Sequence, residues 1–118
     1  MYALFIIGRI LLGGYFIYNG VSHFIQLESL AGYARSKNVP APKFAVGLTG
    51  IMLLIGGLSI LLNMYMREGM IILAIFMIGV TAMMHPFWVV KDPAARMNEQ
   101  IGFMKNLAIL GALLMMIA

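Results

Sequence analysis

The sequence predicts an all-α integral membrane protein, in which four transmembrane helices form a bundle and a short interfacial helix lies in the first connection. Long apolar runs alternate with short charged segments. Hydrophobic residues make up 63% of the 118-residue chain and charged residues 10%, whereas soluble domains have roughly 45–50% and about 25%. The alternating pattern of a membrane β-barrel does not occur in the sequence, so helices are the expected spanning structure. We interpret residues 1–118 as one membrane domain.

The positions of the spans follow from the apolar runs, since a helix needs about 20 residues to cross the hydrocarbon core. The apolar part of the third run, residues 70–84, has only 15 residues, so we expect that span to continue to residue 90. The fourth span is expected to begin with Asp92 as its N-cap and Pro93 as its first helical residue. The predicted spans are therefore about 1–25, 44–66, 70–90 and 93–118.

The first connection contains its own helical pattern. Apolar residues recur at helical spacing at Leu27, Leu30, Ala31 and Ala34, between polar neighbours. This pattern predicts a short amphipathic helix lying in the membrane interface. Two prolines follow in residues 38–42, and they should end this helix and start the second span.

The distribution of basic residues predicts the orientation. The net charge of +4 is best interpreted as an orientation signal, and we expect no nucleic-acid partner. Basic residues are rare in the second connection and frequent in the other two, so we place connections one and three in the cytoplasm and both termini outside a multi-pass cell (inner) membrane protein. The basic residues of these two connections are Arg35, Lys37, Lys43, Lys91, Arg96 and Lys105.

Polar residues at membrane depth are the first candidates for function, because burying them in hydrocarbon is costly unless a partner or water compensates. Each could instead be an isolated interfacial cap or a snorkelling side chain. In the predicted topology the candidates lie at one end of the bundle, the cytoplasmic one. The residues expected to converge there are His23, His85, Lys105 and Asn106, together with the aromatic residues Tyr33 and Trp88.

One stripe of the first span should face the bundle, because its members recur at helical spacing. Arg9 on this stripe lies about 12 Å from the outer end of the span, and no carboxylate occupies the apolar runs. It must therefore meet backbone carbonyls, water, lipid phosphate or a ligand such as a quinone head group. The stripe consists of Arg9, Gly13, Phe16, Gly20 and His23.

Short motifs follow one another over nearly the whole chain: GRILLG at 8–13, NGVSHF at 19–24, YARSKNVPAP at 33–42, GGL at 56–58, HPFW at 85–88, DP at 92–93 and FMKNLA at 103–108. In this order they resemble the DoxX family of small four-helix membrane proteins. The family takes its name from a subunit associated with an archaeal thiosulfate:quinone oxidoreductase, and the resemblance implies a redox-linked membrane setting. Many members carry a glutamate just before the paired glycines, where this sequence has Leu53, and this departure weakens any proton or quinone role carried over to the second span.

Together with the polar end, the resemblance implies an accessory or structural subunit of a quinone-linked membrane redox assembly, without catalytic activity of its own. The polar end is expected to contact either a quinone or a lipid head group, and the expected partners are the lipid bilayer and other membrane subunits or further copies of the chain. Two alternatives remain open, a small-molecule transporter or channel-like protein and a haem b subunit with His23 and His85 as axial ligands. No metal site is expected, and the lack of cysteine excludes disulfide and thiol redox chemistry.

Overall fold

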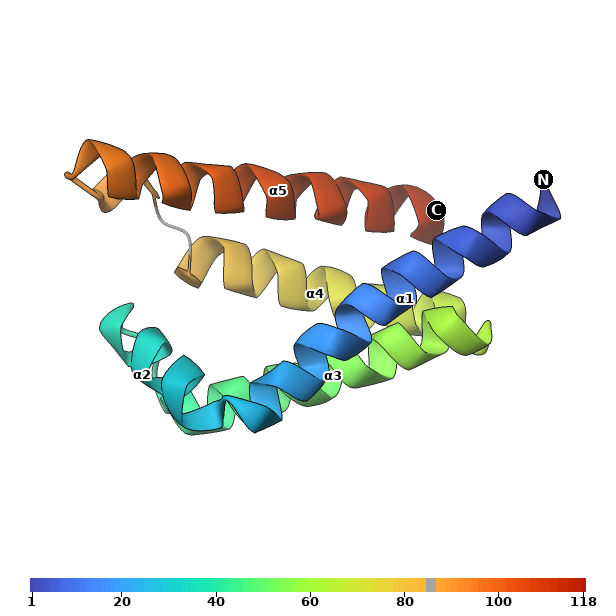
Figure 1. Ribbon diagram of the computed structural model, residues 1–118, viewed down its shortest axis with the longest axis horizontal. Helices are drawn as coiled ribbons and strands as arrows, with labels where there is room; N and C mark the ends of the chain where they lie inside the picture. The colour runs from blue at the N-terminus through green and yellow to red at the C-terminus, as the bar shows by residue number, and fades with distance from the viewer. Residues whose placement is uncertain (85–86) are drawn as a thin grey trace.

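The computed structural model describes residues 1–84 and 87–118 and is all-helical over these residues (Figure 1). Four of the helices, α1, α3, α4 and α5, are long and apolar enough to cross a membrane, as the sequence predicts. The chain is therefore a multi-pass membrane protein. The helices are α1 (Tyr2–Ile25), α2 (Leu27–Ser36), α3 (Pro42–Leu62), α4 (Met66–Met84), the 3-10 helix η1 (Phe87–Val89) and α5 (Pro93–Ile117).

The long helices pack in the order α1, α3, α4, α5, and the short helix α2 lies against α3. Figure 1 shows α2, η1 and the start of α5 at one end of the molecule and both chain termini at the other. We call the first of these the α2 end. The two connections that carry most of the basic residues therefore lie at the same end.

Glycine permits the close crossing of α1 and α3. A Cβ atom on Gly13 would lie 2.9 Å from the carbonyl oxygen of Gly57, and a Cβ atom on Gly57 would lie 2.9 Å from the backbone nitrogen of Ile17. Such separations are too short for carbon, so only glycine lets these backbones approach. Gly13, Phe16 and Gly20 are all buried, which confirms that the predicted stripe of α1 faces the bundle.

Two boundaries differ from the expected ones. α3 ends at Leu62 and α4 begins at Met66, whereas the sequence suggested one apolar run up to residue 66. Asn63 adopts the left-handed conformation with φ 56° and ends α3, since its N–H donates to the carbonyl of Ile60 at 3.3 Å. The candidate membrane span that begins with α4 is Met66–Val89, so it starts before the predicted residue 70 and ends close to the predicted residue 90.

The N-terminus of α5 agrees with the prediction. The Asp92 carboxylate accepts a hydrogen bond from the N–H of Ala95 at 3.0 Å, and Pro93 is the first helical residue. An acidic N-cap also favours the positive end of the helix dipole. This cap fixes where α5 starts and thereby which of its residues face the other helices.

Candidate functional site

Two pockets adjoin each other inside the bundle, with volumes of about 370 Å³ and 170 Å³. The larger one, the apolar pocket, lies beside α2 and is lined mainly by apolar side chains of α2, α3 and α4, such as Leu30, Met52 and Ile75. The smaller one, the polar pocket, lies between α1, α3, α4 and α5 and is lined by Tyr15, Asn19, His23, Lys105 and Asn106 besides apolar residues. His23, Phe76 and Val80 line both pockets.

Asn106 is a buried polar residue that lines the polar pocket. The residue is only 6% exposed, yet the amide forms no hydrogen bond with any residue that the structure describes. Among the described residues, the fully buried side-chain atom without a partner is Thr81 Oγ1, so the Asn106 amide still has access to the pocket. A polar group in this position is stabilised once water or a ligand in the pocket bonds to it.

His23 is held by α3 on one edge of its ring. Its Nδ1 lies 3.0 Å from the carbonyl oxygen of Val46 and 3.1 Å from Thr49 Oγ1. The Thr49 hydroxyl in turn donates to the carbonyl of Ala45 at 2.7 Å. The ring also packs edge-on against Phe76, with the centroids 6.3 Å apart. These contacts fix the imidazole at the junction of the two pockets.

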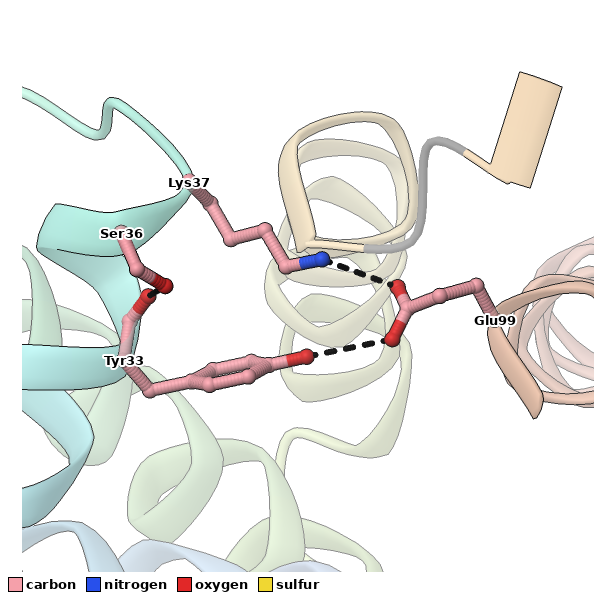
Figure 2. A network of polar contacts seen from close by, with 4 residues as sticks. All are labelled: Tyr33, Ser36, Lys37 and Glu99. Carbon is pink, nitrogen blue, oxygen red and sulfur yellow. Dashed lines mark hydrogen bonds and ion pairs between the residues drawn. The ribbon is translucent and has the colours of Figure 1, made fainter. Parts of the chain in front are cut away.

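A polar bridge joins α2 to α5 at the α2 end (Figure 2). The Tyr33 hydroxyl donates to one oxygen of the Glu99 carboxylate at 3.2 Å, and the Lys37 ammonium lies 3.4 Å from the other oxygen. Burial, and then the negative charge of Glu99, raise the pKa of Tyr33 above its usual value of 10.0. Because Tyr33 also lines the apolar pocket, this α2–α5 bridge holds one residue of that lining in place.

The remaining predicted site residues lie elsewhere. Arg9 donates from Nε to the carbonyl of Ile60 at 3.1 Å and from Nη2 to that of Leu61 at 2.7 Å. These carbonyls belong to the last turn of α3, where backbone acceptors lack partners and the helix dipole favours a cation. Arg9 lies about 21 Å from His23 along α1, so it meets backbone carbonyls, one of the partners predicted for it.

Trp88 belongs to an aromatic cluster rather than to the two pockets. Its ring lies 5.5 Å from that of Phe87 and 5.6 Å from that of Phe103, both edge-on. His85 lies outside the described residues, so the hypothesis of a haem held by two histidines stays a prediction. The structure thus brings together His23, Lys105 and Asn106, with Tyr33 on the neighbouring pocket.

Two residues of the site were missed by the sequence reasoning. Thr49 had no charge to single it out in an apolar run, and a threonine in such a helix normally bonds only the carbonyl one turn back. Glu99 did carry a signal, because it is one of only four acidic residues and lies two turns after Asp92, on the same face of α5. Its side chain is 16% exposed, and that burial was not expected for a residue near the headgroups.

Comparison with known proteins supports the resemblance found in the sequence. The family model DoxX matches residues 4–86, which is well over half of the chain. A search of curated proteins and a search of solved structures each found no match. The chain belongs to the DoxX family.

Proposed function

We propose that this protein is an accessory subunit of a quinone-linked membrane redox assembly and that it holds a quinone-type molecule in its two adjoining pockets. The observation that carries the proposal is Asn106, a residue only 6% exposed whose amide has no hydrogen-bond partner among the described residues and lies on the wall of a pocket also lined by His23 and Lys105. A ligand with polar groups on a ring would satisfy these side chains. An apolar tail would occupy the neighbouring pocket.

The volumes suit such a molecule. A protein cavity of about 150 Å³ admits a benzene ring, and the polar pocket measures about 170 Å³. In the same proportion, the apolar pocket of about 370 Å³ has room for about fifteen carbon atoms of a tail. His23, Phe76 and Val80 line both pockets. The two pockets therefore adjoin each other, as a ring joined to a tail requires.

The residue chemistry also favours a ring with oxygen substituents. The Asn106 amide can donate or accept a hydrogen bond, and the Lys105 ammonium can only donate. Leu53 lines the same pocket, at the position where many relatives in the resemblance carry a glutamate. Because Leu53 is apolar, this departure weakens any proton or quinone role carried over to the second span, and the proposal rests on the residues of the other helices.

Binding of a short-chain benzoquinone to the purified protein in detergent tests the proposal. We expect the quinone to raise the melting temperature of the natural protein, and Asn106→Leu to abolish that shift. Asn98→Leu is the matched control, since Asn98 lies on the same helix but is exposed, and it should leave the shift unchanged. Absence of a quinone-dependent shift in the natural protein, or an equal shift in Asn106→Leu, would contradict the proposal.

The setting in the membrane is part of the proposal. We place the α2 end in the cytoplasm, because the basic residues Arg35, Lys37 and Lys43 lie in the first connection and Lys91 and Arg96 in the third. α2 then lies in the cytoplasmic interface, with the buried residues Ala31 and Ala34 toward the bundle. A reporter active only outside the cytoplasm should work after Ala118, and cytoplasmic activity there would reverse the orientation. Co-purification in mild detergent identifies the redox subunits that accompany the protein.

A further inference from the structure

The hydrogen bonds around His23 determine which ring nitrogen carries the proton in the neutral imidazole. Nδ1 lies 3.0 Å from the carbonyl oxygen of Val46, and a carbonyl oxygen can only accept. The Thr49 hydroxyl has a single proton, which its shortest contact, 2.7 Å to the carbonyl of Ala45, uses. A bare Nδ1 would therefore face the lone pairs of Val46 without a proton between them. In the neutral imidazole, these contacts favour the tautomer with the proton on Nδ1.

The other ring nitrogen, Nε2, then has a lone pair and acts as an acceptor. It forms no hydrogen bond within the part of the chain that the structure describes. His23 is half-buried and lines both pockets, so Nε2 is the ring atom left for a ligand. A ligand hydroxyl can donate a hydrogen bond to Nε2. A carbonyl oxygen placed there would be repelled, because both atoms carry lone pairs and neither carries a proton.

We infer that the polar pocket selects the reduced, dihydroxylated form of the ring, a quinol, over the corresponding quinone. One quinol hydroxyl donates to Nε2 of His23. The Asn106 amide and the Lys105 ammonium do not discriminate in the same way, because each can donate to a carbonyl or to a hydroxyl oxygen. Discrimination therefore depends on His23. This inference deepens the proposed function and rests on it.

The affinities of one molecule in its two redox states test the inference directly. A short-chain benzoquinol and its quinone are titrated anaerobically against the purified protein in detergent. One hydrogen bond gained on the quinol side predicts about fivefold tighter binding of the quinol. In His23→Phe, which keeps a ring at the junction, the two forms should bind equally. In Tyr18→Phe, which removes a hydroxyl from an exposed residue of α1 outside both pockets, the preference should persist.

Nitrogen NMR of histidine-labelled protein without ligand gives an independent measurement. The His23 signals, assigned with the help of a His85→Gln variant, should show a protonated Nδ1 and an unprotonated Nε2. The reverse tautomer would overturn the inference even if His23→Phe failed to fold.

The outcomes separate this inference from the proposed function. Equal affinity for the two forms, or tighter binding of the quinone, overturns the preference for quinol and leaves the quinone-type site standing. Binding of neither form overturns both. A preference for the quinol that persists in His23→Phe overturns the assignment to His23.

Discussion

Replacing Asn106 by leucine should stabilise the protein while removing its ligand. Asn106 is only 6% exposed, and its amide has no hydrogen-bond partner among the described residues. Burying such an amide costs about 1–3 kcal/mol, and the lower figure applies because water in the adjoining pocket compensates in part. Leucine has no polar group to satisfy, and the pocket of about 170 Å³ has room for its methyl groups.

We therefore expect Asn106→Leu to raise the free energy of unfolding by about 1 kcal/mol without ligand. For a chain of this size the melting temperature should rise by about 3–5 °C. Thermal unfolding in detergent, followed by circular dichroism without added quinone, measures the effect. The control Asn98→Leu should change the melting temperature little. A melting temperature of Asn106→Leu below that of the control would refute the reasoning, since the amide would then already have a stabilising partner.

Three further predictions concern other parts of the molecule. Arg9→Met should lower the free energy of unfolding in detergent by about 2 kcal/mol, because two hydrogen bonds from a charged donor to the end of α3 are lost. Altered quinone binding in this variant would contradict the purely structural role given to Arg9. Leu53→Glu should cost about 2 kcal/mol less than Leu73→Glu, because both residues are buried but Leu53 lines the polar pocket with Lys105 whereas Leu73 lines neither pocket. Equal costs in thermal unfolding would show that the pocket does not stabilise the carboxyl group. Because the pKa of Tyr33 is raised, its neutral hydroxyl contributes stability below pH 10.0, and this contribution is lost as the pH rises further. An ultraviolet difference titration of the natural protein against Tyr33→Phe should show a midpoint above 10.0. A midpoint below 10.0 would contradict the hydrogen bond between Tyr33 and Glu99.

The spans and the inward stripe of α1 could be predicted because both follow from the cost of placing charge and backbone in hydrocarbon. That cost separates charged from apolar segments and places Gly13 and Phe16 on a buried face. The break at Asn63 could not be seen in the same way, since it lies within a run that is apolar on both sides. Its signal was the asparagine itself, which tolerates the left-handed conformation.

The candidate site was predictable in its residue types but not in its geometry. His23, Lys105 and Asn106 stood out as polar groups at membrane depth, and they line one pocket. The contacts of Thr49 with His23 and of Glu99 with Lys37 join residues 26 and 62 positions apart. Such pairs depend on how the helices pack against each other, which the periodicity of a single helix does not specify.

Photo-crosslinking with an azido-benzoquinone most directly tests the central claim that the polar pocket holds a quinone-type ring. The purified protein is illuminated with the probe, and the modified peptides are mapped by mass spectrometry. The account predicts labels on pocket residues such as His23, Phe76 and Asn106, and loss of these labels when excess short-chain quinol is present. Labels confined to lipid-facing residues such as Ile10 and Ile78, or labels on the pocket that the quinol does not displace, would contradict it.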